Sequence, residues 1–163
     1  MNQRELKEIL EYEPITGLFI WKKNIKRSKT TKKGSLAGSK DSNGYINIKI
    51  KGKVHKAHRL AWLYVTGEHP DKDIDHINHI SGDNRFSNLR LVTKSENQKN
   101  RRLNKNNKSG CVGVSQKKSG QWQAHAQSNG KNKLLGTFDT KEEAITARIK
   151  ANKKYDFHKN HGT

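Results

Sequence analysis

Apolar residues in the first part of the chain recur at two different spacings. Leu6, Ile9 and Leu10 have the spacing of one helix face. Residues 45–50 instead alternate between apolar and polar side chains, which is the pattern of a strand with one buried face. With the turn signals between them, these spacings predict a helix over residues 2–11, strands over 18–21, 45–50 and 53–57, and a helix over 58–65.

Residues 72–102 predict a strand, a polar loop, a second strand and a helix in succession. The first strand ends at Asp75, and residues 89–92 form the second. Thr93-Lys94-Ser95-Glu96 has the form of a capping box, so we expect a helix to begin there and to carry Asn97. Such a unit would bring Asp75, His76 and Asn97 together.

The remainder of the chain predicts a separate module after a polar linker. Trp122, Ala124 and Ala126 alternate with polar side chains, and Ser128-Asn129-Gly130 is a hairpin turn signal. A second capping box begins at Thr140 and opens a helix rich in alanine. The expected elements are a strand near 112–114 that includes Cys111 as a small buried side chain, strands over 121–127 and 134–138, and a helix over 140–155.

The expected fold class is therefore α+β, with small antiparallel sheets in two modules. The first domain would span residues 1–97, and its candidate catalytic residues would lie in a unit near 72–102. A basic linker would cover 98–110, and a three-stranded sheet with one packed helix would cover 111–158.

Composition adds a strong electrostatic constraint. The chain has 163 residues and a formal net charge of +19, from 34 Lys and Arg against 15 Asp and Glu. A domain this basic usually binds a polyanion; nucleic acid is the leading candidate and an anionic membrane the second, while simple solubilising charge is the bland alternative. No long apolar run favours a membrane, and no secretory pattern opens the chain, so we expect a cytoplasmic protein. The single cysteine, Cys111, excludes an internal disulfide and a cysteine-rich zinc site.

Asp75-His76, followed by Asn88 and then Asn97, suggests metal-assisted cleavage of a phosphodiester bond. A histidine near its ordinary pKa can take a proton from water. Carboxylate and amide oxygens are the ligands that magnesium and manganese prefer, and Asn100 could replace Asn97 as a ligand. Two histidine pairs, His55-x-x-His58 and His76-x-x-His79, also suggest zinc, but an extended pair diverges and no thiolate is near, so we favour the first interpretation.

The sequence around these residues resembles the phage HNH endonucleases, a group of ββα-metal nucleases. The resemblance rests on His58-Arg59-Leu60-Ala61-Trp62, Asp75-His76-Ile77-Asn78, the segment from Asn84 to Arg90, and Ser95-Glu96-Asn97. It implies that His76 is the general base and that Asn88 fixes the loop so that the histidine points at the phosphate. It also implies that Asp75 and Asn97 hold one divalent ion, Mg or Mn, loosely because asparagine is a neutral ligand.

The second module resembles the Apetala-type (ethylene-response-factor) DNA-binding domain. The matching residues are Gly113-Val114, Gly120-Gln121-Trp122 and the segment from Leu135 to Ala144. The resemblance implies that the open face of the sheet reads the major groove. Several arginines and tryptophans of the plant-type pattern are replaced here, so the target sequence stays open. The matching positions are Ser115, Lys117, Gln123, His125, Gln127 and Asn132.

Together, the two resemblances predict a site-selective, homing-type DNA endonuclease that nicks double-stranded DNA as a monomer in the cytoplasm, the host's if the chain is phage-encoded. A non-catalytic DNA-binding protein that keeps the fold and a basic RNA-binding protein are the rival interpretations. Backbone phosphates would be contacted by Arg59, Lys99, Arg101, Arg102 and Lys105.

Overall fold

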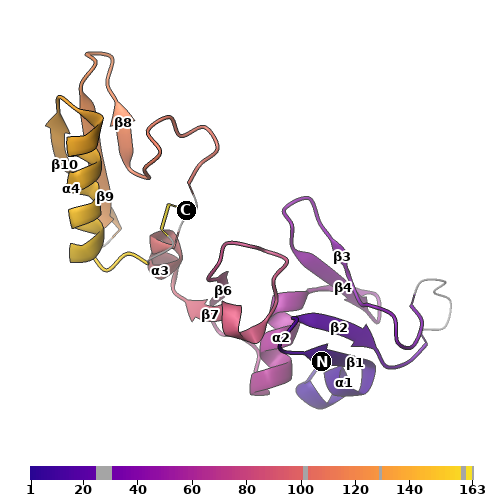
Figure 1. Cartoon of the computed structure of the whole chain (residues 1–163). Helices are drawn as coiled ribbons and strands as arrows, with labels where there is room; N and C mark the ends of the chain where they lie inside the picture. Colours follow the sequence, from indigo (N-terminus) through magenta and orange to yellow (C-terminus); the bar gives the residue numbers. More distant parts are fainter. Residues whose placement is uncertain (25–30, 101–102, 129, 159–160, 163) are drawn as a thin grey trace. The chain divides into compact units, whose positions relative to one another are not determined.

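The structure is a computed structural model that describes residues 1–24, 31–100, 103–128, 130–158 and 161–162 (Figure 1). The chain divides into two compact units, Met1–Val92 and Thr93–Thr163. The division falls before the helix that carries Asn97, whereas we expected the first domain to include that residue.

The first unit combines helices with small antiparallel sheets. Its elements are α1 (Gln3–Ile9), β1 (Leu10–Glu13), β2 (Leu18–Trp21), β3 (Ser39–Lys40), β4 (Ile46–Ile50), β5 (Lys53–Lys56), α2 (Ala57–Thr66), β6 (Asp73–His76), the 3-10 helix η1 (Phe86–Asn88) and β7 (Leu89–Val92). β1 pairs with β2, β3–β4–β5 form a three-stranded sheet, and β6 pairs with β7. The core is drawn from α1, the hairpins and α2, with Leu6, Leu10, Ile48 and Leu63 fully buried.

Most elements predicted in this unit are confirmed, but the first helix is shorter than expected. It begins at a capping box on Asn2 and ends at Ile9. Leu10 belongs to β1 instead, because it pairs with Trp21 and both side chains are buried in the core. α2 ends at Thr66, and its C-cap Gly67 has a φ of 86°, in the left-handed region.

The second unit is a three-stranded antiparallel sheet with one long helix (Figure 1). Its elements are α3 (Lys94–Lys99), β8 (Val114–Gln116), β9 (Trp122–Ser128), β10 (Lys131–Phe138) and α4 (Lys141–Lys154). The capping boxes at Thr93 and Thr140 open α3 and α4 as predicted. The core is small and is formed by Val114, Ala124 and Ala144 with partly buried neighbours.

Two details of the second unit differ from the sequence-based expectation. Cys111 and Val112 precede β8 rather than forming part of it, and Cys111 is half-buried. The buried residues of α4 are Ala144, Ala151 and the charged Arg148, whose Nε atom donates a hydrogen bond of 2.8 Å to the Val112 carbonyl. Its guanidinium lies over the Phe157 ring, so the arginine is part of the packing.

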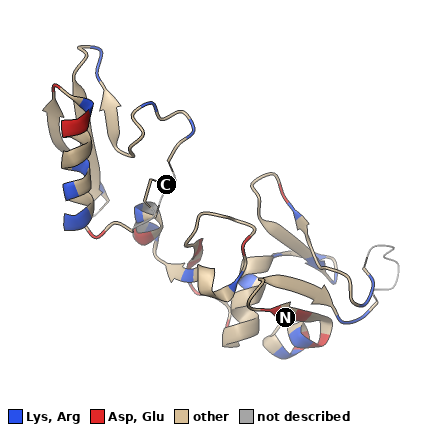
Figure 2. Cartoon of the chain, in the orientation of Figure 1, with Lys and Arg blue, Asp and Glu red and all other residues tan. Residues whose placement is uncertain are grey.

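The mixed α+β class is thus confirmed, with antiparallel sheets in both units. Lys and Arg residues occur on helices and loops of both units (Figure 2). Among the described residues, no helix has the length and apolar composition needed to cross a membrane.

Candidate active site

Asp75 and His76 lie at the end of β6, where strand pairing fixes their surroundings. Asp75 is opposite Arg90 and His76 is opposite Leu89 in the antiparallel register. Asp75 is 8% exposed and His76 is 6% exposed. The Asp75 Oδ2 atom accepts hydrogen bonds from Arg90 Nε at 3.0 Å and from Arg90 Nη2 at 2.8 Å. The carboxylate is therefore held by a cation from the neighbouring strand.

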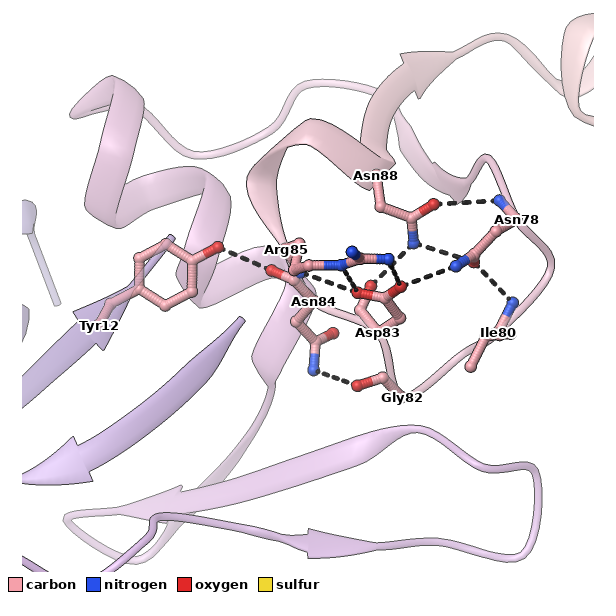
Figure 3. Close-up of polar contacts among 8 residues, drawn as sticks. All are labelled: Tyr12, Asn78, Ile80, Gly82, Asp83, Asn84, Arg85 and Asn88. Atoms are coloured by element: carbon pink, nitrogen blue, oxygen red, sulfur yellow. Dashed lines mark hydrogen bonds and ion pairs between the residues drawn. The ribbon is translucent and has the colours of Figure 1, made fainter. Parts of the chain in front are cut away.

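Asn88 closes the loop that follows β6 (Figure 3). Its Oδ1 atom accepts a hydrogen bond from the Asn78 backbone N–H at 3.0 Å. Its Nδ2 atom donates to Asn78 Oδ1 at 3.0 Å and to the Asp83 carbonyl at 2.9 Å. Since one buried amide joins both ends of the loop, it fixes the backbone path beside His76.

Asp83 ties the same loop together through its side chain (Figure 3). One carboxylate oxygen accepts a hydrogen bond of 2.7 Å from Asn78 Nδ2, and the other accepts one of 2.8 Å from Arg85 Nε. The Arg85 guanidinium is the main reason that the pKa of Asp83 lies below its usual value. The loop thus keeps its conformation through internal polar contacts.

The N-terminal hairpin supports the loop from outside. The Tyr12 hydroxyl donates a hydrogen bond of 2.7 Å to the Asn84 carbonyl, and burial raises the pKa of Tyr12 to about 12 (Figure 3). Gly17, with φ of 74°, lies so close to the Arg85 backbone nitrogen that a Cβ atom would overlap it. The first hairpin therefore helps to set the position of the loop.

Tyr45 and His58 form a ring cluster with His76. The His58 and His76 rings are 5.1 Å apart between centroids and nearly perpendicular, at 88°. The Tyr45 ring lies 5.4 Å from His58 and 5.8 Å from His76. These contacts hold the His76 ring through packing as well as through polar groups.

A partly exposed ion pair helps to hold Tyr45 in this cluster. Asp41 Oδ1 accepts a hydrogen bond of 3.0 Å from the Tyr45 backbone N–H, and Asp41 Oδ2 pairs with Lys56 Nζ at 2.7 Å. The Lys56 hydrogen bond is the largest cause lowering the pKa of Asp41 to about 2. Lys56 Nζ also lies 5.0 Å from the Tyr45 ring centroid. The turn before β4 therefore supports one wall of the site.

Burial keeps His76 in its neutral form at neutral pH. Desolvation is the largest effect and lowers the pKa of this imidazole, although a hydrogen bond with the Asn84 side chain and the charge of Asp75 oppose it. A neutral imidazole can accept a proton, which is what a general base requires.

Because His58 is buried, we expect the stability of the fold to depend on pH. Burial lowers its pKa to about 4 from the ordinary 6.5. The unfolded chain therefore binds this proton more readily than the folded chain does. The contribution of neutral His58 to the stability of the fold is complete above pH 6.5 and is lost as the pH falls toward 4. Between pH 7 and pH 5, the His58 contribution to the unfolding free energy should fall by about 2 kcal/mol.

A His58→Phe variant tests this prediction because it keeps the ring and removes the titration. Urea unfolding at pH 7 and pH 5, followed by tryptophan fluorescence, should show a pH-dependent loss about 2 kcal/mol smaller than in the unsubstituted chain. An equal loss in both proteins would contradict the prediction.

The Asp75 side chain suits a divalent cation. It offers hard oxygen atoms at a nearly buried position, although Arg90 already binds one of them. Asn97, its expected partner, is exposed on α3 in the second unit, and Asn100 is buried at the end of that helix. The shared coordination of one ion by Asp75 and Asn97 stays a prediction.

Histidine-based metal sites gain no geometric support. Within the described parts of the chain, no three His, Cys, Asp or Glu side chains are grouped to hold a metal ion. His55 lies on β5 whereas His58 lies on α2, and the His58 ring packs against His76. His79 follows in the loop with φ of 61°.

The expected phosphate contacts are distributed over both units. Arg59 is exposed on α2, and its Nη2 atom donates to the Pro70 carbonyl at 3.0 Å. Lys99 ends α3, and Lys105 is exposed beyond it. Arg101 and Arg102 lie outside the described residues.

The expected base-reading residues share one face of the second sheet. Ser115 pairs with Gln123, and Gln127 pairs with Asn132. His125 lies between the two glutamines on β9, whereas the alternating alanines of that strand are buried. Lys117 is exposed just after β8. A hollow of about 660 Å³ borders this face and is lined in part by Ser115, His125, Gln127 and Asn132.

Four residues around His76 had no role beside it assigned from the sequence. They are Arg90, Tyr45, His58 and Asn84. A lysine or arginine inside a short, mostly apolar strand was the available signal for Arg90. His58 shares a helix face with Ala61, which was the signal for its burial.

Comparison with curated proteins and with solved structures gives no significant match. A family model matches a segment that covers α2, β6, β7 and α3. Its segment contains Asp75, His76, Asn88 and Asn97. Residues 55–99 match the HNH endonuclease family, which supports an HNH nuclease acting on DNA.

Proposed function

We propose that this chain is a metal-dependent, site-selective DNA endonuclease in which His76 is the general base. One observation carries the proposal: a buried imidazole directly follows a buried carboxylate, beside a loop fixed by Asn88, inside the segment that matches the HNH family. Each of these groups has a role in phosphodiester hydrolysis.

In the proposed reaction, a water oxygen attacks phosphorus while its proton passes to the neutral His76 ring. The bond from phosphorus to the 3′ oxygen breaks, and that oxygen takes up a proton from solvent. The products carry a 5′-phosphate and a 3′-hydroxyl. A divalent ion, Mg or Mn, held by Asp75 and Asn97 would supply positive charge at the phosphate and the departing oxygen. The Tyr45 and His58 rings hold the His76 ring in place.

The second unit would direct the enzyme to its site. Its polar sheet face presents amide, hydroxyl and imidazole groups, and glutamine or asparagine can bond adenine through two hydrogen bonds. We assign the face to an Apetala-type mode of binding and the whole chain to the phage or mobile-element homing type. With one active site per chain, a monomer would nick one strand per event.

The direct test uses supercoiled plasmid and the purified full chain. We expect relaxed circles with magnesium or manganese and none with chelator, since the reaction needs the ion's charge. End-labelling of the product should show 5′-phosphate ends.

A chain that binds duplex DNA but leaves the plasmid intact with every divalent metal would instead be a non-catalytic DNA-binding protein. Competition between duplex DNA and structured RNA tests whether the chain is instead an RNA-binding protein, because a net charge of +19 attracts both nucleic acids. Stronger binding to RNA would contradict the proposal.

A further inference from the structure

Arg90 already occupies one oxygen of Asp75, the side chain that is expected to bind the metal ion. Both donating nitrogens, Nε and Nη2, bind the same atom, Oδ2. Because both donors bind Oδ2, the positive charge of the guanidinium lies beside that oxygen, where a metal ion would also be attracted. A divalent ion that approaches Oδ2 must therefore displace Arg90 or share the oxygen with it.

The two partners differ in how easily they can move. The Asp75 side chain is 9% exposed, whereas the Arg90 side chain is 30% exposed. Asp75 is fixed on β6 within the buried edge of the hairpin, and Arg90 can swing outward on its long side chain. Displacement therefore moves the arginine and leaves the carboxylate in place.

We propose that Arg90 is a further active-site residue that exchanges partners. It holds Asp75 in the DNA-free protein and binds a DNA backbone phosphate when Asp75 takes the metal ion. The proposal rests on the proposed function. Two observations favour a phosphate as the second partner of Arg90. A planar guanidinium binds phosphate through two parallel hydrogen bonds, and the proposed reaction brings a phosphate next to Asp75.

The exchange couples metal binding to DNA binding. While Arg90 stays on Asp75, it competes with the ion and keeps metal affinity low. DNA that attracts the guanidinium removes the competitor, so each ligand strengthens the binding of the other. The free enzyme would then hold little metal until it reaches its substrate.

Metal affinity in the absence of DNA gives the sharpest test. Calorimetric titration of manganese into the full chain should show about fivefold tighter binding to an Arg90→Gln variant than to the unsubstituted protein, because a competing cation is lost. Arg4→Gln is the matched control: it removes an exposed arginine from an ion pair with Glu8, and manganese affinity should not change. Asp75→Asn should abolish the binding.

Arg90→Lys keeps the test decisive if Arg90→Gln does not fold. Lysine retains the charge without the two-donor geometry, so its manganese affinity should lie between those of the other two proteins. A second titration adds a duplex with a non-hydrolysable linkage at the cleavage site. DNA should tighten manganese binding more in the unsubstituted chain than in either variant.

Equal or weaker manganese binding in the Arg90 variants without DNA, or an equal tightening by DNA in all three proteins, would overturn the exchange and leave the ion pair a structural contact. This result is independent of cleavage. A chain that fails to nick plasmid while Arg90→Gln binds manganese more tightly would refute the proposed reaction and retain the competition at Asp75.

Discussion

Replacing His76 by alanine is expected to lower the rate of plasmid nicking by about 10²- to 10⁴-fold, the usual contribution of a general base. The substitution removes the group that accepts the water proton. It leaves the Asp75–Arg90 pair and the loop contacts of Asn88 intact, since neither includes His76. Duplex affinity should therefore change little. Single-turnover cleavage and electrophoretic mobility shift measure the two quantities separately.

His69→Ala is the control for His76→Ala. His69 is an exposed histidine of the same unit whose ring contacts the Met1 carbonyl at 2.9 Å. Its removal should leave the nicking rate unchanged. If both variants nick at the unsubstituted rate, His76 is not the base, and another group must take the proton.

Local signals were sufficient to predict much of the secondary structure. The capping boxes at Thr93 and Thr140 mark the starts of α3 and α4, because both reciprocal hydrogen bonds are encoded within four residues. The strict alternation of β4 likewise specifies one buried face. By contrast, Leu10 satisfies both a helical spacing and a strand pairing, and only its long-range partner Trp21 decides between them.

The environment of the site was less predictable than its central residues. Asp75 and His76 stand out from their chemistry, whereas the Asp75–Arg90 pair depends on the register of β6 against β7. That register is set by the loop between the strands, whose conformation comes from Asn88 and Asp83. Contacts of this kind join residues far apart in sequence and leave no periodic signal.

Arg148 in the second unit also depends on contacts that leave no periodic signal in the sequence. Its spacing from Ala144 and Ala151 places it on the buried stripe of α4, but charged residues are seldom fully buried. The Val112 carbonyl and the Phe157 ring accommodate it, and both lie outside the helix. Helical spacing therefore agrees with the position of Arg148, whereas the partners that accommodate it cannot be predicted from the helix alone.

Asn88→Ala is expected to lower both stability and activity. The substitution removes three hydrogen bonds and leaves buried polar groups of Asn78 and Asp83 without that partner. The unfolding free energy of the first unit should fall by about 2 to 4 kcal/mol. The nicking rate should fall even when the chain is folded, because the loop beside His76 loses its fixed path.

A double-mutant cycle with Asn78→Ala separates this loop role from a general loss of packing. The Asn78 side chain accepts a hydrogen bond from Asn88 Nδ2, whereas the bond to Asn88 Oδ1 comes from the Asn78 backbone and survives the substitution. Urea unfolding should therefore show a coupling energy of about 0.5 to 3 kcal/mol between the two positions. Additive effects on stability, or an Asn88→Ala chain that nicks at the unsubstituted rate, would show that the loop keeps its conformation without this amide. The position of His76 would then depend on the Tyr45 and His58 rings instead.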